Sequence, residues 1–225
     1  MNCTMKKINA MFVLIFIFCA QNFKSQNVLP PESVFKLYFD SFVKHDDESL
    51  RELNSYLINF LGKDYTFRMS LNESYTGKIN YFTEIFLSNL SPEVAAACKV
   101  ETEKYFTVLM ENYKNAKYTI KSIKSVPITD SKTQEMSEVT FDVNFKVPKN
   151  TSELKMNDIK KAGIKEVKKY LADLTVYFEK ADKVITSEQK FNLFQVKAGE
   201  NTYYWNGGPE ELNWKLNAFY LKNAN

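Results

Sequence analysis

The single histidine of the chain lies beside three carboxylates, in the run His45-Asp46-Asp47-Glu48. Imidazole and carboxylate groups are ligands of zinc and of other divalent metals. Side chains of neighbouring residues point apart, however, so these four do not converge on one ion. An Asp directly before an apolar-periodic stretch is a typical helix N-cap. We therefore interpret the run as a turn in which Asp46 or Asp47 caps a helix, and we predict no metal site and no cofactor.

Asp142 is the second residue whose type could do chemistry. A carboxyl group acts as a general acid or base when an apolar pocket brings its pKa near the working pH. Val139 to Val147 alternate apolar and polar residues, which places Asp142 on the face opposite to Phe141 and Phe145. If those phenylalanines face the core, Asp142 faces water. We therefore predict no catalytic residue at this position.

An aromatic-rich region near the C-terminus offers the third candidate. Exposed Tyr and Trp rings stack on sugars or anchor protein partners, whereas buried ones fill a core. Both interpretations stay open: alternate rings fill the core, or the group contacts a ligand or partner. The predicted contact residues are Tyr203, Tyr204, Trp205 and Trp214.

The first 25 residues have the pattern of a signal peptide. Lys6 and Lys7 precede an apolar run from Ile8 to Ala20, which is too short to span a membrane. We place cleavage between Ser25 and Gln26; lipidation at Cys19 is the alternative, although Phe18 stands where a small residue is preferred. The protein is therefore expected to be exported, to the periplasm or the extracellular space, without a membrane span.

The composition of the remaining chain excludes several classes of function. Removing Lys6, Lys7 and Lys24 from the 30 basic residues leaves 27, equal to the 27 acidic ones. A neutral chain with two arginines lacks the basic patch that nucleic acids require. After cleavage Cys98 is the one cysteine left, so no internal disulfide forms. It follows three alanines, which favours a buried small apolar group over a nucleophile.

The apolar spacing predicts helices first and then an antiparallel sheet, an α+β pattern. Residues 63–76 are expected to be irregular, with Asn72 and Gly77 as breakers. A bulge is expected near Ser122 because the apolar parity changes there. Residues 209–222 fit both a strand and a helix, and strand is slightly favoured. The expected helices cover 32–44, 47–61, 78–89, 91–113 and 157–180, and the expected strands cover 117–126, 139–147, 184–196 and 202–205.

Two stretches carry a family resemblance. Residues 31–50, PESVFKLYFDSFVKHDDESL, resemble the first two helices of exported NTF2-like (cystatin-like) domains of Bacteroidetes-type bacteria. Residues 189–205, QKFNLFQVKAGENTYYW, resemble the closing hairpin of that family. The resemblance implies N-terminal helices packed on a curved antiparallel sheet, a cone, with a helix inserted between strands. It covers about half of residues 26–225, which we expect to be one domain with a C-terminal extension from about residue 206.

NTF2-like domains include enzymes and binding proteins, so the fold alone does not decide the function. We expect an exported, non-catalytic binding protein for a small apolar ligand, a glycan or another protein. One alternative is an isomerase or hydrolase acting on a small molecule inside the cone. The other is an immunity or inhibitor protein against a secreted toxin. A deep apolar cavity with converging Asp and Tyr would favour the enzyme.

Overall fold

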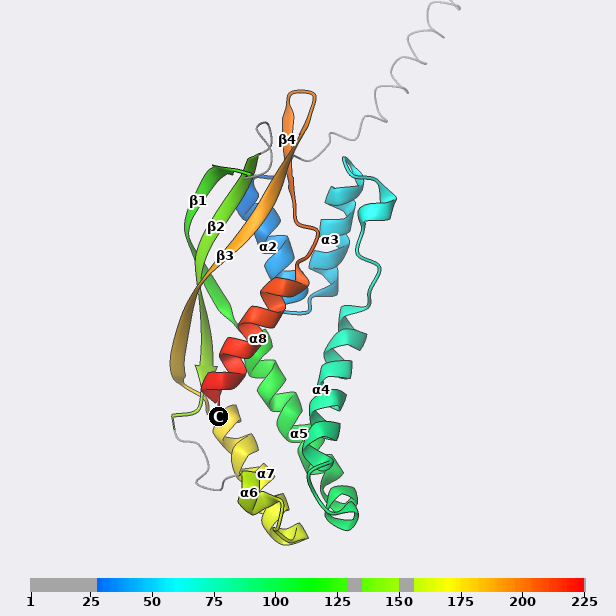
Figure 1. Ribbon diagram of the computed structural model, residues 1–225, viewed down its shortest axis with the longest axis vertical. Coiled ribbons are helices and arrows are strands. Elements are labelled where there is room, and N and C mark those ends of the chain that lie inside the picture. Colours follow the sequence, from blue (N-terminus) through cyan, green and yellow to red (C-terminus); the bar gives the residue numbers. More distant parts are fainter. Residues whose placement is uncertain (1–27, 129–134, 150–155, 225) are drawn as a thin grey trace, which may run out of the picture.

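The computed structural model describes residues 28–128, 135–149 and 156–224 (Figure 1). The helices are α2 (Pro31–Phe42), α3 (Asp47–Ile58), the short 3-10 helix η1 (Lys63–Tyr65), α4 (Leu71–Leu87), α5 (Pro92–Lys114), α6 (Met156–Ile159), α7 (Ile164–Glu179) and α8 (Glu210–Ala224). The strands are β1 (Lys117–Pro127), β2 (Glu135–Val147), β3 (Lys183–Ala198) and β4 (Asn201–Trp205).

The first two helices begin where the sequence places start signals. Proline occupies the first position of α2, where its missing N–H removes no hydrogen bond. Asp46 caps α3 by accepting hydrogen bonds from the backbone N–H groups of Glu48 and Ser49. The expected capping turn is therefore confirmed, with Asp46 rather than Asp47 as the cap.

The strands form one antiparallel sheet in the order β1-β2-β3-β4. The register between β1 and β2 shifts between Ile120 and Ser122, which confirms the bulge expected there. In β2 every second side chain from Ser137 to Val147 is buried. The sheet thus presents one apolar face, and α2, α5 and α8 contact strands of the sheet (Figure 1).

Aromatic rings fill the space between α2 and the sheet. Phe35 of α2 lies within 4.7–5.9 Å, centroid to centroid, of four rings: those of Phe39, Tyr118, Phe141 and Phe191. Phe35, Phe39 and Phe141 are completely buried. The concave face of the sheet is therefore packed with side chains at this level.

Helix α4 begins earlier than the sequence predicts. Its N-cap is Ser70, whose hydroxyl accepts a hydrogen bond from the backbone N–H of Glu73. The helix then runs through Asn72 and Gly77, which were predicted to break it. A glycine inside an exposed helix face costs only about 1 kcal/mol, and the cap and the buried face of α4 outweigh that cost. The expectation of irregular structure over 71–76 is therefore wrong.

The helix predicted over residues 157–180 is divided in two. Helix α6 ends at Ile159, and α7 begins at Ile164 after a turn. The backbone N–H of Gly163 donates a hydrogen bond to the side chain of Glu166, which closes the first turn of α7. A local cap thus restarts the helix where the apolar spacing continues without a break.

The slight preference for a strand over residues 209–222 is wrong, because the segment forms helix α8. Leu212, Leu216 and Tyr220 are buried at four-residue spacing, whereas Trp214 is 73% exposed. A strand would have placed Trp214 on the same face as Leu212 and Leu216. Two glutamates in the first turn also suit the positive end of the helix dipole.

The molecule is an α+β protein with helices packed on a curved antiparallel sheet, as the sequence predicts. Helices α6 and α7 lie between β2 and β3 in the chain, so the inserted helical segment is confirmed. Helix α8 contributes Leu216 and Tyr220 to the same core. In the described parts of the chain, no helix is both long enough and apolar enough to cross a membrane.

Candidate functional site

The three consecutive aromatic residues predicted as contacts have different environments. Tyr203 is fully buried and stacks on Phe60, with ring centroids 4.6 Å apart. The backbone N–H of Tyr204 donates a hydrogen bond to the hydroxyl of Tyr56 at 2.8 Å. The structure therefore makes Tyr203 part of the core, while Tyr204 and Trp205 remain partly exposed.

Trp205 belongs to a surface patch that the sequence analysis did not predict. Its ring lies 5.9 Å from that of Phe194 and 6.3 Å from that of Tyr65, centroid to centroid. Tyr65 comes from η1, far from the hairpin in sequence. Trp214, the fourth predicted contact residue, lies on the exposed side of α8 and has no ring contact with this patch in the described residues.

Asp142 lies on the outer face of the sheet, as its alternation with Phe141 predicts. Its carboxylate is 3.7 Å from the ammonium of Lys121, which also binds Glu188 at 2.5 Å. Lys121 thus forms cross-strand ion pairs with both carboxylates at the surface. Such pairs contribute little to stability, between about 0 and 1 kcal/mol.

The remaining candidates are separated from one another. Cys98 is buried, and burial raises the pKa of its thiol, which disfavours the nucleophilic thiolate. His45 is buried beside Tyr75, whereas the three acidic residues 46–48 that follow it are exposed. Within the described residues, no group of three His, Cys, Asp or Glu side chains could hold a metal ion. Ser25 and Gln26 lie outside the described residues.

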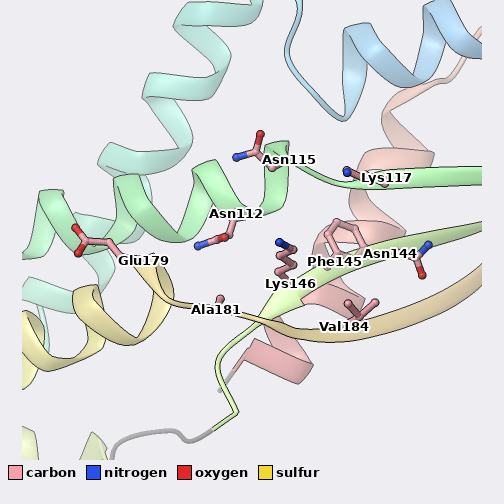
Figure 2. Close-up of a pocket in the computed structure, with 9 residues that line it drawn as sticks. All are labelled: Asn112, Asn115, Lys117, Asn144, Phe145, Lys146, Glu179, Ala181 and Val184. Atoms are coloured by element: carbon pink, nitrogen blue, oxygen red, sulfur yellow. The ribbon is translucent and has the colours of Figure 1, made fainter.

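A cavity of about 660 Å³ opens where α5 and α7 end and the strands begin (Figure 2). Its size falls within the range of about 300–1,000 Å³ that is typical of small-molecule sites. It brings together side chains that are far apart in sequence: Asn112, Asn115, Lys117, Asn144, Phe145, Lys146, Glu179, Ala181 and Val184. Three further hollows in the described residues, each of about 520–620 Å³, are lined by fewer elements.

Two of the three amides of the cavity are held in place by hydrogen bonds. Asn112 donates from Nδ2 to the backbone carbonyl of Phe178 at 2.8 Å, which links the ends of α5 and α7. The Oδ1 of Asn144 accepts a hydrogen bond from the hydroxyl of Thr186 at 2.6 Å. The amide orientations are therefore fixed before any ligand arrives, which lowers the entropic cost of binding.

The backbone of β2 adds hydrogen-bonding groups to the same place. Strand β1 begins at Lys117, opposite Asn144, so Phe145, Lys146 and Val147 pair with β3 but not with β1. One side of this short stretch is thus not paired with β1, and it is open to a ligand only at the exposed Lys146, since Phe145 and Val147 are almost completely buried.

No protein-family model, curated protein or solved structure matches this chain. Its function must therefore be argued from the described residues themselves. The cavity lining offers amides, ammonium groups and one carboxylate, together with a few apolar side chains, of which Val184 is exposed. It contains no histidine, cysteine, serine or threonine, and no second carboxylate to form an acid–base pair with Glu179. That inventory suits recognition by hydrogen bonding better than catalysis.

The sequence did not predict the cavity. Its polar members come from a helix end, a strand start and a loop, and each alone is an ordinary surface residue. The asparagines near the end of α5 were the one local signal, since Asn112 and Asn115 flank the last turn of that helix. Only the pairing of β2 with β1 and β3 brings Asn144 and Val184 to the same place.

Proposed function

We propose that the protein is an exported binding protein that holds a short glycan in the cavity at the ends of α5 and α7. The observation that carries the proposal is the lining: three asparagine amides and two lysines, with Ala181 and the exposed side chain of Val184 as apolar members. Amides both donate and accept hydrogen bonds, which matches the hydroxyl groups of a sugar. The exposed methyl groups of Val184 suit the C–H face of the ring.

The packed concave face of the sheet supports binding rather than catalysis at that face. An isomerase or hydrolase of the resembled NTF2-like type needs an apolar pocket with a carboxyl inside it. Here aromatic rings occupy the concave face next to α2, and Asp142 lies on the outer face. The export signal supports a location outside the cytoplasm, where glycans of the cell envelope are available.

Titration calorimetry with short neutral, amino and uronic oligosaccharides tests the glycan proposal. We expect saturable binding that Asn115→Ala and Lys117→Met each weaken about tenfold, because each removes a hydrogen bond to the ligand. Asn72→Ala, an exposed asparagine of α4, is the matched control and should bind as the parent protein does. Absence of binding across the panel, or equal loss in the control, would contradict the proposal.

Export has its own test. N-terminal sequencing of the protein recovered from outside the cytoplasm should give a chain that starts at Gln26. A chain that starts at a lipidated Cys19, or that retains Met1, would contradict the predicted cleavage.

A protein partner, as for an immunity or inhibitor protein, is the second candidate function. The end of β2 at the exposed Lys146 favours it, because β1 does not pair there and an extended segment of a partner could do so. Hydrogen exchange separates the two candidates. Strand pairing should slow exchange of amides in 145–147 on partner binding, whereas a glycan held by side chains should leave them nearly unchanged.

A further inference from the structure

Four titratable side chains lie around Tyr75, where α4 packs on α5. The ring of Tyr75 lies 5.3 Å from the ring of His45 and 5.2 Å below the ammonium of Lys114. Its hydroxyl donates a hydrogen bond to Glu111 at 2.5 Å. Lys78 lies three residues along α4, on the same face of the helix. We call His45, Tyr75, Lys78, Glu111 and Lys114 the Tyr75 cluster.

The backbone holds His45 in this cluster. Its φ is +54°, and it is the one residue other than glycine with a positive φ in the described residues. The next backbone N–H, that of Asp46, donates to the carbonyl of Asp40 at 3.1 Å. This tight turn between α2 and α3 directs the imidazole inward, and the residue is only 7% exposed. Strained backbone of this kind persists where the surrounding structure enforces it.

Two members of the cluster have buried nitrogen atoms without a partner. Nδ1 and Nε2 of His45 and Nζ of Lys78 are inaccessible to solvent and form no hydrogen bond. Buried polar atoms are nearly always hydrogen-bonded in folded proteins, and an unpaired one costs about 1–3 kcal/mol, more when charged. The charge of Lys78 acts on His45, so the two groups lie near each other, and their unpaired nitrogens call for a common partner.

The charges of the cluster specify that partner. Lys78 and Lys114 are cationic, and the one carboxylate, Glu111, already accepts the hydroxyl of Tyr75. Burial, and then the charges of Lys78 and Lys114, lower the pKa of His45 to about 4, so its ring is neutral near pH 7. Burial also lowers the pKa of Lys78 to about 8. The cluster has more donors and positive charge than it can satisfy internally.

We propose that the Tyr75 cluster binds a small inorganic anion, held by the ammonium groups of Lys78 and Lys114 and by the N–H of His45. Ammonium and imidazole N–H groups form strong charge-assisted hydrogen bonds with anions. A metal cation does not suit the site, because two ammonium groups repel it. The site is separate from the glycan cavity, since none of the five residues lines that cavity.

Thermal unfolding of the full-length protein with chloride or phosphate as the probe tests the proposal. Ionic strength is held constant with the sodium salt of a bulky sulfonate buffer. Binding to the folded state alone raises the melting temperature along a saturating curve. We expect such a curve for at least one of the two anions at pH 7. Lys78→Met and Lys114→Met should each weaken the apparent affinity at least about tenfold.

Two further variants make the result specific. Lys104→Met removes an exposed ammonium from the same helix as Lys114 and should leave the anion response unchanged. Lys78→Arg keeps a cation in place and should retain part of the response. In NMR titrations, the same anion should raise the pKa values of His45 and Lys78, which a purely structural effect of the substitutions would not do. A linear response without saturation, or one unchanged in Lys78→Met, would overturn the proposal.

Discussion

Tyr38 in the aromatic core beneath α2 and His45 in the Tyr75 cluster are both buried, but their polar atoms differ in whether they have a partner. In the core, the hydroxyl of Tyr38 accepts from the backbone N–H of Asn206 and donates to its carbonyl, at 2.8 and 3.0 Å. In the cluster, both ring nitrogens of His45 and the ammonium of Lys78 have no partner.

A buried polar atom that is paired within the fold supports the structure, whereas a buried polar atom without a partner can bind a ligand. The hydroxyl of Tyr38 ties α2 to the segment after β4, so its polar atom forms part of the architecture. The nitrogens of the Tyr75 cluster make the folded state less stable at neutral pH unless a ligand offsets the cost. We therefore expect removal of a polar group to cost more stability in the core than in the cluster, and removal of the unpaired ammonium of Lys78 to increase stability.

The largest effect is expected from Phe35→Ala in the aromatic core. The side chain is completely buried and touches four rings, so its removal leaves a cavity that the neighbours cannot fill. The free energy of unfolding should fall by about 3–5 kcal/mol, measured by denaturant titration. Val100→Ala, on an exposed face of α5, is the control and should change it by less than about 0.5 kcal/mol. A loss below about 1 kcal/mol at Phe35 would show that the core is loosely packed.

The next largest effect is the pH dependence that His45 imposes. The unfolded chain binds a proton at the ordinary pKa near 6.5, whereas the folded protein resists protonation until about pH 4. The unfolded state therefore binds more protons in this window, and stability falls as the pH falls. The contribution is about 3 kcal/mol over the whole window, measured as the free energy of unfolding between pH 7 and pH 4.

His45→Asn isolates that contribution, because asparagine tolerates a positive φ and does not titrate in this range. The variant should lose less stability than the parent protein on acidification, while the carboxylates titrate alike in both. Parallel pH profiles for the two proteins would show that His45 is not held neutral by its surroundings.

A matched pair of substitutions compares the two regions directly. Tyr38→Phe removes a hydroxyl that satisfies two buried backbone groups and should cost about 2 kcal/mol. Tyr75→Phe removes one donor from Glu111, a partly exposed carboxylate that water can still solvate, and should cost about 1 kcal/mol or less. Equal losses in denaturant titrations would contradict the distinction drawn between core and cluster.

The fold could be predicted largely because its apolar patterns are local. The alternation of β2 and the change of parity near Ser122 gave the sheet and its bulge. The wrong predictions arose where a helix signal competed with a breaker residue or with a strand-like pattern. Gly77 and Asn72 suggested a break that the Ser70 cap overrides, and α8 was obscured because its apolar residues at 212, 214, 216, 218 and 220 also fit a strand.

The candidate sites were much less predictable. His45 was interpreted through its sequence neighbours, the carboxylates 46–48, yet its ring packs on Tyr75, thirty residues away. Lys78 and Lys114 have no sequence feature that distinguishes them from the other lysines. Only tertiary packing decides which ammonium groups lose water, so chemistry that depends on burial is not encoded in a local motif.

The smallest expected effect, and the one that most sharpens the comparison, comes from Lys78→Met. Methionine matches the apolar stem of lysine and removes the buried charge. The folded pKa of Lys78 lies near 8, below its ordinary value of 10.5, so the folded state disfavours the ammonium at neutral pH. The variant should be about 1 kcal/mol more stable at pH 7 in buffer without small anions, after allowance for the part of the side chain that reaches solvent. This gain should shrink as the pH rises from 8 to 10.5, because the parent lysine then releases its proton, and denaturant titrations across that range measure it.

Added chloride or phosphate should reduce the gain as well, since the anion stabilises only the protein that keeps its ammonium. A loss of stability in Lys78→Met at pH 7 would mean that the ammonium already has a partner within the fold, which would make the cluster structural in the same sense as the core.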